Sequence, residues 1–147
     1  MPAPKSVFDV AAYILQVLGP VTHMKLQKLV YYAQAWSLVW DESPIFNDRI
    51  EAWANGPVVP KLFARLKGKF KVAKTDLRAG DPNKLDPTQK ETLRLVIDFY
   101  GPKSSQWLSD LTHMEDPWKD ARAGLAPGER GSNEITTDTM AWYYGSL

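Results

Sequence analysis

The first part of the chain alternates apolar and polar residues with the 3.6-residue period of an α-helix. Apolar side chains recur at helical spacing over residues 7–18, and Gly19-Pro20 follows as a pair that ends helices. Ser6 and Asp9 have the spacing of a capping box, in which two side chains bond the free backbone N–H groups at a helix start. The pattern therefore predicts a helix that begins just after Ser6.

A second helical segment, residues 23–40, is apolar on nearly every side. Thr22 precedes it as an N-cap, and its polar side chains occupy only narrow sectors, chiefly those of Lys25, Gln27 and Gln34. A helix that is apolar all round belongs in the centre of a domain. We therefore expect residues 23–40 to form the organising helix.

The pattern changes near residues 44–54, where short apolar pieces flank the turn-forming pair Asn47-Asp48. This segment predicts a small β-hairpin or an irregular arm. Asn55-Gly56-Pro57 then predicts the entry to a helix, with Pro57 or Pro60 in its first turn and Gly68 at its end. Residues 67–84 are basic and then rich in turn formers, so we expect an exposed connection there.

The last third of the chain returns to helical periodicity in segments separated by turn residues. Their start signals are Asp86-Pro87, Ser104 or Ser105, Asp116-Pro117 with Asp116 as the N-cap, and Thr136 or Thr137. The whole pattern predicts a mainly α protein: a single compact bundle of about six helices, with a short β-hairpin or irregular arm near residues 44–54.

Composition narrows the classes of function. The 147 residues suit one domain, and 18 Lys+Arg against 17 Asp+Glu give a net charge of +1, without overall attraction to nucleic acid or anionic membranes. The absence of cysteine excludes disulfides, thiolate catalysis and cysteine-bound zinc. No apolar run reaches the length of a membrane span, and the N-terminus lacks the cleavage pattern of a signal peptide. We expect a cytoplasmic protein without a membrane partner.

Nucleic acids and phosphate cofactors are not expected ligands. The first two predicted helices superficially suggest a helix-turn-helix, but the second is apolar where a recognition helix needs a polar face that reads bases. Glycine-rich phosphate loops are missing from the sequence. We therefore do not expect direct nucleic-acid binding, and no cofactor is predicted.

The stretch SDLTHMEDPW, residues 109–118, contains His113, one of only two histidines. A metal site would need further ligands at set spacing, and no His-x-x-x-His or Glu-x-x-His pattern exists. Acid–base catalysis would need a partner, and the nearby serines lack the context of a catalytic triad. The remaining interpretation is a helix joint, in which His113 hydrogen-bonds backbone and Trp118 packs beside it. We therefore do not expect an enzyme.

Aromatic residues make up 12% of the chain, more than a bundle of this size requires. Exposed aromatic side chains anchor protein partners because they offer large contact areas at low entropic cost. The sequence predicts a partner surface in the region from Trp36 to Trp53 and along the basic stretch from Lys67 to Lys74. The residues expected to bind a partner are Trp36, Trp40, Phe46, Trp53, Lys67, Lys69, Lys71 and Lys74.

Three blocks, MKLQKLVYYAQAW, PIFNDRIEAWANGPVVPKLF and THMEDPW, together resemble the Panacea domain family, which includes SocA-like antitoxins and phage-associated GepA-like proteins. The resemblance covers residues 7–144 as one domain and leaves residues 1–6 as a short tail. The positions that match the family pattern, interpreted as scaffold, are Lys25, Gln27, Lys28, Tyr31, Tyr32, Gln34, Glu51, Trp53, Gly56, Pro57, Thr112, His113, Pro117 and Trp118.

The resemblance implies an antitoxin that neutralises a cognate, adjacently encoded protein toxin by direct binding. Toxins paired with this family are often inhibitors of translation, and some relatives instead deliver the toxin to a Clp-type protease. The alternative hypothesis is a phage or mobile-element regulatory protein, or a protease adaptor, that binds a host factor.

Overall fold

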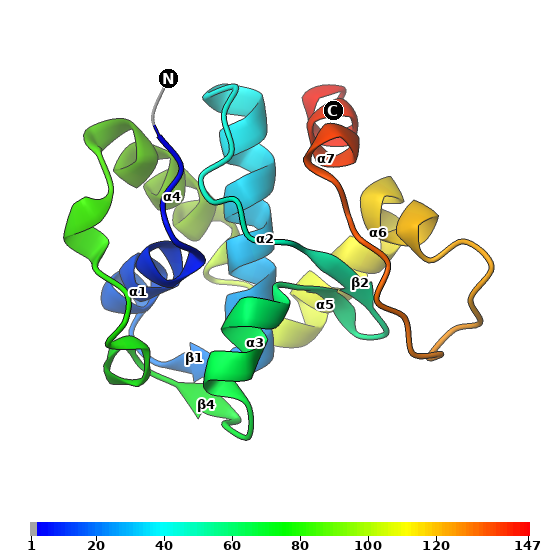
Figure 1. Ribbon diagram of the computed structural model, residues 1–147, viewed down its shortest axis with the longest axis horizontal. Coiled ribbons are helices and arrows are strands. Elements are labelled where there is room, and N and C mark those ends of the chain that lie inside the picture. The colour runs from blue at the N-terminus through cyan, green and yellow to red at the C-terminus, as the bar shows by residue number, and fades with distance from the viewer. Residues whose placement is uncertain (1–2) are drawn as a thin grey trace.

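A long central helix, α2 (His23–Trp40), organises the computed structural model, which describes residues 3–147. Figure 1 shows α1 (Val7–Leu18) and α4 (Pro87–Tyr100) on one side of α2, and α7 (Thr137–Gly145) on the other. The shorter helices are α3 (Pro60–Leu66), α5 (Ser105–Met114) and α6 (Asp116–Ala121). These seven α-helices of the described residues confirm the predicted mainly α fold.

Helix α2 is buried because its apolar residues face neighbours on every side. Leu26, Leu29 and Val30 are fully inaccessible to solvent, and α1, α4, α5 and α7 all pack against the helix. Its buried amides bond backbone instead of water: Gln34 accepts a hydrogen bond from the Ile45 N–H (2.9 Å) and donates one to the Phe46 carbonyl (2.8 Å). These bonds hold the segment after α2 against the helix.

Local capping chemistry sets most helix starts, as the sequence predicts. Ser6 and Asp9 form a capping box on α1, and Asp86 forms one with Gln89 on α4. The side chains of Ser104 and Thr136 cap α5 and α7. Each of these polar side chains satisfies an N–H group that the helix itself cannot bond.

The start of α6 differs from the prediction. Glu115, and not Asp116, is in the N-cap position, where its backbone is extended, and its side chain makes no capping bond. The Glu115 carboxylate instead accepts hydrogen bonds from buried tyrosines, so a tertiary contact replaces local capping.

The β-hairpin also lies later in the chain than the predicted turn at Asn47-Asp48. Strand β2 (Glu51–Trp53) pairs antiparallel with β3 (Gly56–Val58), so the turn is at residues 54–55. Gly56 has a φ of 125°, which residues with a side chain rarely adopt. The helix therefore does not start at Asn55-Gly56-Pro57, and α3 begins at Pro60, the second of the two prolines expected in its first turn.

The hairpin gains a further partner near the C-terminus. The Ala52 N–H bonds the Asn133 carbonyl and the Ile135 N–H bonds the Ile50 carbonyl, each at 2.9 Å. Pro57 faces Ala52 in the register of β2 and β3, and the Ala52 N–H points away from β3. The missing N–H of Pro57 therefore costs the hairpin no ladder bond.

Residues 67–84 are more structured than the predicted exposed connection. Strand β4 (Lys71–Val72) pairs with β1 (Val21–Thr22), and two short 3₁₀ turns, η1 (Lys74–Leu77) and η2 (Pro82–Lys84), pack against α1. The sequence shows basic and turn-forming residues here, but Val72 and Leu77 are buried in the core. Because these two side chains are buried, the segment packs against α1 and is not simply an exposed connection.

The predicted N-terminal tail, residues 1–6, falls partly outside the described residues, because these begin at residue 3. Lys5 pairs with Phe46 as an isolated bridge, and the Lys5 N–H bonds the Ile45 carbonyl at 2.8 Å. Within the described part of the chain, none of the helices has both the length and the apolar character needed to cross a membrane.

Candidate functional site

The three sequence blocks meet where the β2–β3 hairpin packs against α2 and α5. Gly56 lies at the centre of this contact. A Cβ at Gly56 would stand 2.4 Å from Cε of Lys28 and 3.2 Å from Oγ1 of Thr112, so these two side chains leave space only for hydrogen there. The lysine of the first block therefore passes over the glycine of the second and beside the threonine of the third.

A pocket of about 370 Å³ opens beside this contact, and we call it the Lys28–His113 pocket. Its lining consists of Met24, Lys28, Asn55, Ser105, Gln106, Ser109, Asp110 and His113. In residues 3–147, only two buried side-chain nitrogen or oxygen atoms lack a hydrogen-bond partner, Nζ of Lys28 and Nε2 of His113. Both belong to side chains that line this pocket.

Lys28 is an unusual residue for the interior. Its exposed fraction is 1%, and no carboxylate among residues 3–147 forms an ion pair with it. Burial lowers the pKa of Lys28 to about 7, since removing an ammonium from water disfavours the charged form. Lys25, one turn earlier, instead donates to the Gly101 carbonyl at 2.6 Å.

His113 combines a structural contact with a free nitrogen. Its ring stacks on Trp118 with centroids 3.9 Å apart. This is the packing expected of a helix joint. Burial, and then the nearby Lys28, lowers the pKa of His113, which favours the neutral ring. In a neutral ring, Nε2 can donate or accept a hydrogen bond, depending on the tautomer.

An open groove of about 480 Å³ lies next to the pocket, and we call it the Trp53 groove. Its lining consists of Met24, Glu51, Trp53, Ala54, Asn55, Val58, Phe63, Arg130, Gly131 and Ser132. The rings of Trp53 and Phe63 meet edge to face with centroids 4.9 Å apart. Met24 and Asn55 line both cavities, so the groove and the pocket are neighbours.

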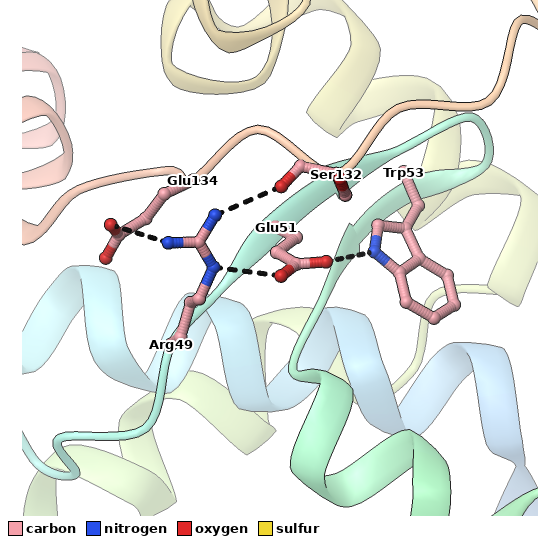
Figure 2. A network of polar contacts seen from close by, with 5 residues as sticks. All are labelled: Arg49, Glu51, Trp53, Ser132 and Glu134. Atoms are coloured by element: carbon pink, nitrogen blue, oxygen red, sulfur yellow. Dashed lines mark hydrogen bonds and ion pairs between the residues drawn. The ribbon is translucent and has the colours of Figure 1, made fainter.

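A polar network fixes Trp53 in this groove (Figure 2). Oε1 of Glu51 accepts a hydrogen bond from the Trp53 indole at 2.9 Å, while Arg49 binds Oε2 of Glu51 at 2.8 Å. Arg49 also binds Glu134 at 3.0 Å and donates to the Ser132 carbonyl at 3.1 Å. Arg49 therefore links Glu51, the hydrogen-bond partner of Trp53, to the segment that contains Ser132 and Glu134.

A second polar group lies in the interior, and we call it the Glu115 cluster: Tyr31, Tyr32, Glu115 and Tyr144. Oε1 of Glu115 accepts hydrogen bonds from Tyr32 (2.6 Å) and Tyr144 (2.8 Å), and the hydroxyls of Tyr31 and Tyr144 lie 3.0 Å apart. Burial raises the pKa of Glu115, and the two tyrosine hydrogen bonds act against that shift. The cluster joins α2, α7 and the start of α6.

The other positions that match the family pattern are buried or half-buried. Oε1 of Gln27 accepts from the Val59 N–H at 3.0 Å, and the Trp118 indole donates to the Trp53 carbonyl at 2.8 Å. Pro57 and Pro117 are buried.

The predicted partner surface divides into separate regions. Trp36 stacks on the half-exposed Trp40 at the C-terminal end of α2, whereas the exposed lysines at 67, 69, 71 and 74 surround β4 near its N-terminal end (Figure 1). Phe46 is fully buried, which corrects its predicted place at the surface. Its carbonyl is bonded by Gln34, and its ring fills the core.

The sequence pattern places Lys28 and His113 among the family positions. It does not show that Nζ of Lys28 and Nε2 of His113 lack hydrogen-bond partners. One signal was present: Lys28 lies in a helix that is apolar on nearly every side, where a charged residue is unexpected. No group of three or more metal-ligating side chains occurs among the residues described.

Comparison with protein families matches residues 26–119 to the family described as "Antitoxin SocA-like, Panacea domain". The matched segment contains Lys28, Gly56 and His113, and it spans more than half of the chain. No curated protein and no solved structure gives a match. The chain belongs to the SocA-like Panacea domain family.

Proposed function

We propose, on the premise of this family membership, that the protein is an antitoxin that binds a cognate protein toxin directly and masks it without catalytic turnover. The observation that carries the proposal is the family match over residues 26–119. The family resemblance further supports a toxin that is encoded next to the antitoxin and inhibits translation.

The Trp53 groove is the surface that best suits a toxin segment. It is open and lined by apolar and aromatic side chains, with Arg130 exposed beside it. Tryptophan and arginine are the residue types that most often dominate binding at protein interfaces. Because Glu51 holds the Trp53 indole, the ring loses little freedom when a partner covers it.

Co-expression with the product of the neighbouring gene tests this proposal. We expect that product to stop growth alone, and growth to return when the antitoxin is present and co-purifies with it. The variant Ala54→Arg places a large side chain in the groove at a half-buried turn residue and should abolish both effects. The matched control is Ala141→Arg, at a half-buried residue of α7 outside the groove lining.

The amount of toxin in the rescued cells separates masking from proteolytic delivery. Masking predicts restored growth with an undiminished toxin level, whereas an adaptor for a Clp-type protease would lower that level. Capture of a host protein, with no toxic neighbour and no growth rescue, would favour the alternative of a regulatory protein that binds a host factor.

A further inference from the structure

We propose that Lys28 and His113 form a binding site for the carboxylate or phosphate group of a small polar ligand. The inference does not depend on toxin binding. It rests on the two buried polar atoms that lack hydrogen-bond partners, because both belong to side chains that line one pocket of about 370 Å³. A volume of this size suits a small metabolite.

The arrangement is costly if it serves the scaffold alone. A buried ammonium without an acceptor loses its hydration and gains nothing in return, so an apolar side chain of the same length would stabilise this position better. Gly56, which has no side chain, lies where the Lys28 side chain passes. Two unsatisfied atoms at one pocket are explained together when a ligand satisfies both.

The chemistry of the lining defines the ligand class. The Lys28 ammonium is a donor and a positive charge, so it selects an anionic oxygen. Nε2 of His113 has no partner in the protein, so in the tautomer that carries its proton it donates a second hydrogen bond to the same anionic group. The four-carbon stem of Lys28 lets the ammonium move toward the ligand from its buried position.

The outer part of the pocket adds polar groups of the opposite kind. Asp110 lines it and accepts a hydrogen bond from Gln106 at 2.8 Å, and the hydroxyl of Ser109 donates to the Asn55 carbonyl at 2.7 Å. A carboxylate at this position repels polyanions and attracts N–H or O–H groups. The ligand we infer therefore carries one anionic group beside polar donors.

Nuclear magnetic resonance of the free, isotopically labelled full chain tests the site directly. Sodium acetate and inorganic phosphate are the probes, and sodium chloride at matched ionic strength is the control. We expect a saturable shift of the His113 ring signals and of the backbone amides of Gly56 and Thr112 with at least one probe. Equal responses to chloride, or no saturable response to either probe, would overturn the proposal.

Variants then assign the response to the two side chains. Lys28→Met keeps the length of the side chain without its charge and should weaken binding of the responding probe by about 10-fold or more. Lys119→Met, at an exposed lysine of α6, should leave binding unchanged. Equal binding by wild type and Lys28→Met would refute the role of the lysine.

A second variant covers the case in which Lys28→Met fails to fold. His113→Phe retains an aromatic ring against Trp118 but removes Nε2, and it should weaken binding several-fold. Unchanged binding by this variant would exclude His113 from the site. Because no toxin is present in these experiments, their failure leaves the antitoxin proposal standing, and failure of growth rescue leaves this one standing.

The pH dependence of binding is a readout that a purely structural lysine would not change. Ionisable groups around Lys28 are His23 on its own helix, Asp110 and His113 on α5, and Arg122 beyond His113. Loss of the Lys28 proton should weaken binding as the pH rises above 7, and Lys28→Met should lack that dependence. A wild-type affinity that is constant between pH 6 and pH 9 would contradict the proposed contact.

Discussion

The Lys28–His113 pocket and the Glu115 cluster both bury ionisable side chains, and they differ in how these are satisfied. Glu115 is 8% exposed, and one of its oxygens accepts hydrogen bonds from two tyrosines. Lys28 is 1% exposed, and its nitrogen has no partner. A satisfied buried network stabilises a fold, whereas an unsatisfied one costs stability. The comparison supports a structural role for the cluster and the proposed ligand site at the pocket.

The largest expected effect on stability comes from removing the hydrogen-bond acceptor of the Glu115 cluster. Glu115→Ala removes the acceptor of Tyr32 and Tyr144 and leaves both hydroxyls buried, so it should lower the free energy of unfolding by about 3 kcal/mol. Chemical denaturation measures the change. Glu115→Gln keeps an acceptor oxygen and should cost less, and an equal loss for both variants would show that the hydrogen bonds are not what Glu115 contributes.

The next largest effect on stability comes from adding a side chain at Gly56, where the three sequence blocks meet. Gly56→Ala introduces a Cβ 2.4 Å from Cε of Lys28 at a φ of 125°, and it should cost about 2–3 kcal/mol through strain and steric overlap. In a Lys28→Ala background the overlap is absent, so the same substitution should cost measurably less. Additive costs in this double-mutant cycle would mean that the two residues do not interact.

Replacing the unpaired Lys28 should change the free energy of unfolding in the opposite direction. Lys28→Met removes an unpaired buried cation and retains the volume of the side chain, so it should raise the free energy of unfolding by about 1–2 kcal/mol at pH 7. Thermal and chemical denaturation beside the Lys119→Met control measure the gain. A loss of stability would show that Lys28 has a stabilising partner.

The smallest effect is a dependence of stability on pH. Burial lowers the pKa of Lys28 to about 7, while an unfolded lysine keeps its proton to about pH 10. The unfolded state therefore binds more protons above pH 7, and stability should rise by about 1 kcal/mol between pH 7 and pH 8. The variant Lys28→Met should lack this rise when denaturation is compared at the two pH values.

Tyrosine ionisation sets the upper limit of that experiment. Burial raises the pKa values of Tyr32 and Tyr144, so their folded forms keep protons that the unfolded chain loses near pH 10. Stability should fall again in that range, in wild type and Lys28→Met alike. A wild-type curve that is flat between pH 7 and pH 9 would contradict the low pKa of Lys28.

The predictable part of this fold is the part that neighbouring residues control. The helix over residues 23–40 and the caps at Ser6, Asp86 and Ser104 follow from spacing of a few residues. The hairpin was harder to place, since Asn47-Asp48 and Asn55-Gly56 are both good turn formers. Pairing of the later strands, and of residues 133–135 with Ile50 and Ala52, decided between them.

By itself the sequence determined the helical class, the central helix, most helix starts and the three blocks that belong to one family. Only the tertiary structure decided that Lys28, Gly56 and His113 meet, and that Lys28 lacks a partner. The physical reason is range. Periodicity and capping act within a turn or two of helix, whereas burial and hydrogen-bond satisfaction depend on residues far apart in the chain, such as Tyr32 and Glu115. A lysine in an apolar helix indicates a buried charge that needs a partner. Only the surrounding residues show that the described part of the fold provides none.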